Sequence, residues 1–69
     1  MTKKIYIEGM SCNHCVRHVE EALKDIDGVM SVSVDLQKKL ATVELARAIE
    51  DEKFKSAIYE AGYEVVKIE

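Results

Sequence analysis

The sequence contains neither proline nor tryptophan, and it holds only two cysteines and one phenylalanine. No apolar run approaches the roughly 20 residues that a helix needs to span a bilayer, so we expect no membrane insertion. The first residues, Met-Thr-Lys-Lys, lead into an alternating stretch and not into the apolar core of a signal peptide. We therefore expect a cytoplasmic protein, in which free thiols stay reduced and a structural disulfide is not expected.

A length of 69 residues allows one domain only, and we expect it to comprise residues 1–69. Hydrophobic residues make up 48% of the chain, which is enough for a single modest core. The formal net charge is −3, and the lysine pairs at 3–4 and 38–39 are too few to create a strongly basic surface. This balance argues against a nucleic-acid binder.

The first half of the chain predicts a strand followed by a helix. Residues 3–8 alternate apolar and polar side chains, as a half-buried strand does. A helix is predicted over residues 13–25, with Ser11 or Asn13 as its N-cap and Gly28 in the left-handed position that ends it. Its apolar positions recur at helical spacing and form the predicted buried stripe: Val16, Val19, Leu23 and Ile26.

A hairpin is predicted next, with strands at residues 29–35 and 40–45 joined by a short polar turn. The first of these strands is expected to place three apolar side chains on its inner face: Met30, Val32 and Val34.

The last third predicts a second helix and a final strand. The helix is expected to begin at Glu50 or Asp51, whose acidic side chains suit a helix N-terminus, and to end at Gly62. The strand covers residues 63–68, and its Val65-Val66 step breaks the alternation, which favours an edge position.

The element order is thus βαββαβ. Because right-handed crossovers put both helices on one side, this order predicts an α+β, ferredoxin-like sandwich with a four-stranded antiparallel sheet and two helices on one face. The loop between the first strand and first helix then lies at one end of the molecule. The turn at Gly62-Tyr63 is expected to return beside that loop.

Cys12 and Cys15 carry the only strongly nucleophilic chemistry of this loop. A thioredoxin-like redox pair usually sits in a longer domain with a nearby proline, and this chain has none. A c-type haem site needs histidine where Val16 stands, and an iron–sulfur cluster needs four thiolates. Cys15 falls in the first turn of the helix, where the dipole favours a thiolate. A metal held by two thiolates therefore remains.

Zinc and a soft monovalent ion are the two alternatives for such a metal. His14 and His18 could complete a zinc site, but structural zinc usually draws its four ligands from two well-separated pairs. Here all four candidates crowd into residues 12–18, so Cys12 would have to fold back over the helix. Two thiolates on an open loop suit Cu(I), which accepts two or three sulfur ligands.

The stretch Gly9-Met10-Ser11-Cys12-Asn13-His14-Cys15 resembles the Gly-Met-Thr/Ser-Cys-x-x-Cys signature of the heavy-metal-associated domain family. The likeness extends over essentially the whole chain and includes the Ala61-Gly62-Tyr63 end of the second helix. It is strongest for bacterial copper chaperones of the CopZ type. The resemblance implies a ferredoxin-like fold and Cu(I) bound by Cys12 and Cys15. Ser11 stands where relatives that favour zinc or cadmium tend to carry an acidic residue, which speaks for copper.

The residues near the two cysteines are weaker candidates for the metal site. Met10 and Ser11 belong to the loop, and Met10 is expected to pack beneath it and not to bind the metal. His14 points about 100° away from Cys15 on a helix, so we expect it to face solvent or a dimer contact. For Tyr63 the resemblance implies a ring that leans over the loop, and an ordinary core-edge role is the alternative. His18 is expected to be plain surface.

The predicted function is a Cu(I) metallochaperone with no catalytic residues, which is a binding protein and not an enzyme. By resemblance its partner is the metal-binding domain of a copper-transporting P-type ATPase. A copper-responsive regulator is a second candidate partner, a copper-bridged homodimer a third. Zn, Cd, Hg and Ag ions are expected to bind in vitro. The rival hypotheses are an excised N-terminal domain of a metal-transporting ATPase, a small thiol–disulfide redox protein and a zinc-stabilised module.

Overall fold

Two helices and four strands follow one another in the predicted βαββαβ order, in a computed structural model that describes residues 1–69. The elements, in chain order, are β1 (Thr2–Glu8), α1 (Asn13–Lys24), β2 (Val29–Asp35), β3 (Leu40–Leu45), α2 (Asp51–Glu60) and β4 (Glu64–Ile68). Neither helix is long and apolar enough to cross a membrane.

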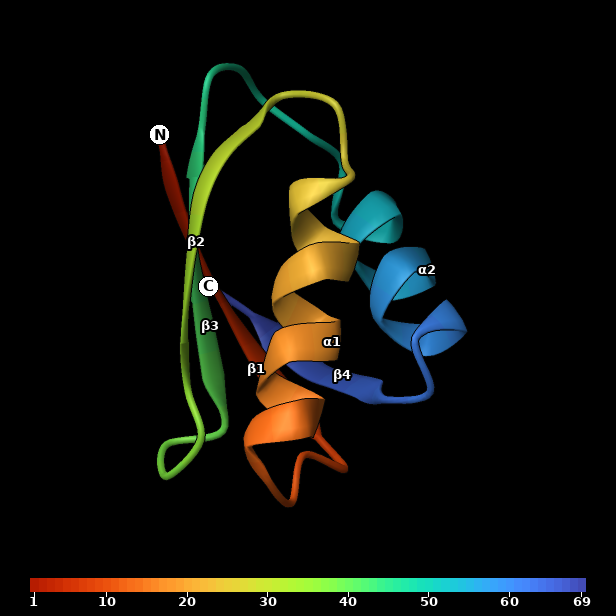
Figure 1. Cartoon of the computed structure of the whole chain (residues 1–69). Coiled ribbons are helices and arrows are strands. Elements are labelled where there is room, and N and C mark those ends of the chain that lie inside the picture. The colour runs from red at the N-terminus through yellow and green to blue at the C-terminus, as the bar shows by residue number, and fades with distance from the viewer.

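The four strands form one antiparallel sheet in the order β2-β3-β1-β4. Both helices lie on the same side of it, as Figure 1 shows. The predicted ferredoxin-like α+β sandwich is therefore confirmed, as is the edge position of the last strand. Because β1 is central and α1 follows it directly, the loop between them (residues 9–12) lies at one end of the molecule (Figure 1).

The core lies between the sheet and the two helices. The central strands, the inner helix faces and one loop residue supply its ten buried residues: Ile5, Ile7, Met10, Val19, Leu23, Ala41, Val43, Leu45, Phe54 and Ile58. Of the stripe predicted for α1, Val19 and Leu23 are fully buried, while Val16 and Ile26 are partly buried beside them. One residue of the thiol loop, Met10, packs in this core and so fixes the loop to it.

A bulge in β2 overturns part of the predicted strand face. Val29 pairs with Leu45, but the next paired residue is Ser31, so Met30 is left out of the ladder and is 69% exposed. The extra residue reverses the alternation, as a β-bulge does. Val29 therefore joins Val32 and Val34 against the core in place of Met30.

The irregularity in β4 has the same cause. Tyr6 pairs with Lys67 and Ile7 with Val65, so the ladder skips Val66, which is 57% exposed. The bulge explains why the Val65-Val66 step breaks the alternation of the sequence.

The end of α1 also differs from the prediction. The helix stops at Lys24, and Asp25 is its C-cap. Gly28 does have a positive φ of 102°, but it lies in a turn beyond the helix that the Val29 amide closes by donating to the Ile26 carbonyl at 3.1 Å. The bounds of α2 agree better with the prediction, because that helix starts at Asp51 after the N-cap Glu50 and its C-cap Ala61 directly precedes Gly62.

Candidate metal centre

The two thiols sit at the N-terminus of α1. Cys12 is the N-cap, with an extended backbone (φ −158°, ψ 176°), and Asn13 is the first helical residue. The prediction that Ser11 or Asn13 caps the helix is therefore wrong, and no side chain makes a capping hydrogen bond. Cys15 follows in the first turn, where backbone N–H groups lack carbonyl partners. The positive end of the helix dipole thus lies beside Cys15, which favours the anionic form of that thiol.

The sulfur atoms of Cys12 and Cys15 lie 3.7 Å apart, and both thiols are free. This separation is too long for a disulfide, whose sulfurs are about 2.05 Å apart. Two metal–thiolate bonds of about 2.3 Å span sulfur separations up to about 4.6 Å, so a single ion can bridge the pair. Cys12 is exposed and Cys15 is partly buried, which confirms the predicted difference in exposure.

Hydrogen bonds lower the pKa of Cys15 from 9.0 to about 6. The largest cause is the backbone N–H of Ser11, followed by the hydroxyl of Tyr63, while partial burial acts in the opposite direction. The Ser11 hydroxyl, 3.8 Å from the Cys15 sulfur, and the Cys12 thiol add smaller effects. At neutral pH Cys15 is therefore mainly a thiolate, which is the form that binds metals.

Tyr63 reaches the thiols because the end of α2 fixes its backbone. The amide of Gly62 donates to the Tyr59 carbonyl and that of Tyr63 to the Ile58 carbonyl, each at 3.0 Å. With a φ of 99° at Gly62, these bonds form a Schellman motif. The Tyr63 ring then lies against Gly9, where a methyl group would be 3.4 Å from its Cδ1 atom. The loop and the α2–β4 turn are thus in contact.

The hydroxyl of Tyr63 has two neighbours, the Cys15 sulfur and the imidazole of His18. Its hydrogen bond to the Cys15 thiolate is the main reason why the pKa of Tyr63 rises to about 12. Its oxygen is also 3.5 Å from Nδ1 of His18. The prediction missed this second contact: His18 is exposed, but it is not plain surface. The available signal was its position three residues after Cys15, which puts both on one side of α1.

The other residues near the motif do not form a cluster of metal-binding side chains with the two thiols. His14 is exposed, whereas Met10 is 7% exposed and packs in the core. No group of three or more His, Cys, Asp or Glu side chains is placed to hold a metal ion. The closed zinc site weighed from the sequence is therefore not formed, and the thiol pair stands alone.

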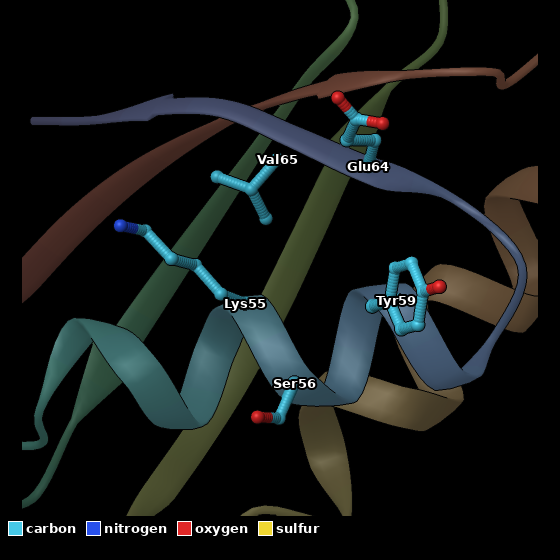
Figure 2. A pocket seen from close by; sticks show the side chains of 5 residues that line it. All are labelled: Lys55, Ser56, Tyr59, Glu64 and Val65. Carbon is cyan, nitrogen blue, oxygen red and sulfur yellow. The ribbon is translucent and has the colours of Figure 1, made fainter.

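A shallow groove between α2 and β4 lies elsewhere on the surface (Figure 2). Its lining is Lys55, Ser56, Tyr59, Glu64 and Val65. It contains no thiol or imidazole, so it offers no soft-metal ligand. The lining of a second hollow includes Gly9 and Tyr63, so this hollow borders the thiol loop.

Comparison with known proteins agrees with this geometry. The profile of the heavy-metal-associated domain family matches residues 4–64. The chain is 42% identical over 66 residues to the copper chaperone CopZ of Staphylococcus haemolyticus, which covers 94% of this chain and 97% of that protein. It is also 42% identical over 67 residues to copper-transporting ATPase 2 of Rhizobium meliloti, covering 96% of this chain but 8% of the ATPase.

Comparison with solved structures points to the same family. A solved structure of a CopZ metallochaperone superposes with a TM-score of 0.88 at 39% sequence identity, covering 96% of this chain and all of the other. The resemblance inferred from the Cys-x-x-Cys loop is thereby confirmed by sequence and by structure. The chain belongs to the heavy-metal-associated domain family.

Proposed function

We propose that this protein is a cytoplasmic copper chaperone that binds Cu(I) through Cys12 and Cys15. The observation that carries the proposal is a pair of free thiols 3.7 Å apart at a helix N-terminus, with the pKa of Cys15 lowered to about 6. The relatives named copper chaperones and copper-transporting ATPases support copper as the cargo. A cytoplasmic site of action fits because free thiols stay reduced there.

The donor set is the reason for preferring Cu(I). Soft thiolates select soft ions, and Cu(I) is satisfied by two or three sulfur ligands. Zn(II) prefers four ligands, and the chain gathers no third protein ligand beside the pair. Ag(I), Hg(II), Cd(II) and Zn(II) are expected to bind in vitro through the same two sulfurs. Only the first two accept such low coordination without ligands from a second molecule.

We further propose that the ion is delivered by thiolate exchange to the metal-binding domain of a copper-transporting P-type ATPase. Cys12 is the exposed ligand, so an incoming thiolate meets the ion from that side. It forms a third metal–sulfur bond before the bond to Cys12 breaks, and the bond to Cys15 breaks last. Each step replaces one soft ligand by another, so the fold does not have to open. The protein acts as a binding and transfer module, not as an enzyme.

An open two-thiolate site also leaves room for sulfur from a second copy of the chain. We propose that excess Cu(I) at high protein concentration yields a copper-bridged dimer with His14 and Tyr63 at the contact. Sedimentation with and without Cu(I) tests for this dimer, and an unchanged monomeric mass would contradict it.

A copper-responsive regulator could receive the ion at the same exposed face. An excised ATPase domain would use the same site, and copper transfer onto separate candidate acceptors distinguishes it from a chaperone.

The binding experiment is an anaerobic competition titration of reduced protein with a Cu(I) chelator, combined with native mass spectrometry. One ion per chain is expected, and Cys12→Ser and Cys15→Ser should each lower the affinity by at least about a hundredfold, because each removes one of two ligands. Ser33→Ala, a similarly small change on an exposed strand position, is the control. Histidine nitrogen in the X-ray absorption spectrum of the copper site would contradict the proposed ligand set.

The thiol–disulfide rival predicts a different result. Such a protein would cycle its thiols with a partner disulfide at a rate that depends on both cysteines. The copper proposal is weakened if reduced protein shows rapid turnover of this kind and no stoichiometric Cu(I) binding.

A further inference from the structure

The proposed function gives His18 no role, yet His18 contacts Tyr63, which in turn interacts with Cys15. Its Nδ1 atom lies 3.5 Å from the Tyr63 hydroxyl, across 45 positions of the sequence. The same hydroxyl also interacts with the Cys15 thiol and helps to lower its pKa. A continuous path of three side chains therefore runs from the exposed face of α1 through Tyr63 to the more buried sulfur.

The hydroxyl of Tyr63 carries one hydrogen and cannot donate it to both neighbours. If Nδ1 of His18 lacks a hydrogen, the imidazole accepts the hydroxyl hydrogen and competes with Cys15 for it. If Nδ1 carries a hydrogen, it donates to the Tyr63 oxygen, and the hydroxyl hydrogen remains for the sulfur. The tautomer of His18 thus decides which way the hydroxyl points.

The rest of Tyr63 is already held in place. Its backbone is fixed by the Schellman motif at Gly62, and its ring lies against Gly9. The rotation of the hydroxyl is the degree of freedom that these contacts leave open, and His18 is the neighbour placed to limit it.

We propose that His18 is a positioning residue, whose Nδ1–H donates to the Tyr63 oxygen and directs the Tyr63 hydroxyl at the Cys15 sulfur. The consequence for metal release rests on the proposed function. Cys15 must leave the ion as a thiolate in the last step of transfer, and a hydrogen bond to that thiolate stabilises it as it leaves. Correct placement of the hydroxyl therefore speeds release, although neither His18 nor Tyr63 needs to touch the ion.

The apo-protein allows a direct test by nitrogen NMR of the imidazole rings at pH 8.5, where an imidazole is neutral. His18 is expected to show the shifts of the Nδ1–H tautomer, with exposed His14 as the internal reference for a solvated ring. Shifts of the Nε2–H tautomer at His18 would overturn the proposal. Tyr63→Phe should return His18 to the tautomer of the reference, because the acceptor oxygen is gone.

A double-mutant cycle tests the effect on release, measured as the rate of Cu(I) transfer to a chelator in excess. His18→Leu should slow release about threefold, a small effect in keeping with one long hydrogen bond. His18→Asn, whose amide can still donate, should restore the rate. In a Tyr63→Phe background His18→Leu should have no effect, because the two changes act through one hydroxyl.

The control for a leucine on this helix is Glu21→Leu, an exposed position one turn further from the thiols. Equal slowing by His18→Leu in both backgrounds, or none in either, would overturn the positioning role. A wild-type protein that binds no Cu(I) would instead refute the proposed function, and the imidazole shifts of the apo-protein would still decide the orientation of Tyr63.

Discussion

Replacing Cys12 by serine leaves Cys15 as the only thiol, so its ionisation can be followed alone. The backbone N–H of Ser11 and the hydroxyl of Tyr63 both stabilise the thiolate and hold the pKa of Cys15 at about 6 instead of 9.0. At pH 7 a thiol with a pKa of 6 is about 90% ionised, whereas one with a pKa of 9 is about 1% ionised. Because the thiolate is the reactive form, this difference is large enough to measure from reaction rates.

The assay is the rate of alkylation by iodoacetamide between pH 4.5 and 9.5, followed by mass spectrometry. The folded Cys12→Ser variant should give a midpoint near 6, and the same variant in denaturant one near 9. Adding Tyr63→Phe should raise the folded midpoint but leave it below 9, because the Ser11 amide, the larger cause, remains. A folded midpoint above pH 8 would refute the argument from these hydrogen bonds.

The same pKa difference makes the stability of the apo-protein depend on pH. A group whose pKa is lowered on folding stabilises the folded state fully above its unfolded pKa and loses this contribution as pH falls through the folded pKa. The stability of Cys12→Ser relative to the variant that also carries Cys15→Ser should therefore fall as pH is lowered from 9 to 6. Chemical denaturation of both variants at several pH values measures this difference in the free energy of unfolding. A constant difference across this range would contradict the linkage.

Four further outcomes concern the fold and the access to the thiols. Phe54→Ala removes the largest fully buried side chain and should cost about 3–5 kcal/mol in urea unfolding. Gly62→Ala meets no atom within 4 Å, so its cost of about 1–2 kcal/mol should come from the positive φ alone. A bulky maleimide at pH 9.5, in limiting amount, should label exposed Cys12 before Cys15; equal rates in peptide mapping would contradict the difference in burial. Metal chelators should leave the circular dichroism spectrum unchanged, because the core is complete without the thiols; a random-coil spectrum would contradict this.

Local sequence was sufficient for the order of the elements and for the family. Strand alternation and helical spacing are periodicities of a few residues, so they show in any window that covers one element. The burial difference between the thiols follows from the same logic, since Cys15 lies four residues before Val19 on the buried stripe and Cys12 precedes the helix. Val16 directly after Cys15 argued against a c-type haem site, and the count of two cysteines argued against an iron–sulfur cluster. The crowding of all four candidate ligands into residues 12–18 argued against a closed zinc site.

Only the tertiary structure decided the features that depend on contacts between distant segments. The exposure of Met30 and Val66 follows from the register in which neighbouring strands pair, and a bulge leaves no certain mark in one strand alone. The approach of Tyr63 to Cys15 and His18 requires the end of α2 to pack against the loop before α1. The lowered pKa of Cys15 depends partly on that contact, because a hydroxyl 48 positions away in the chain can act on the sulfur only after folding has brought the two together.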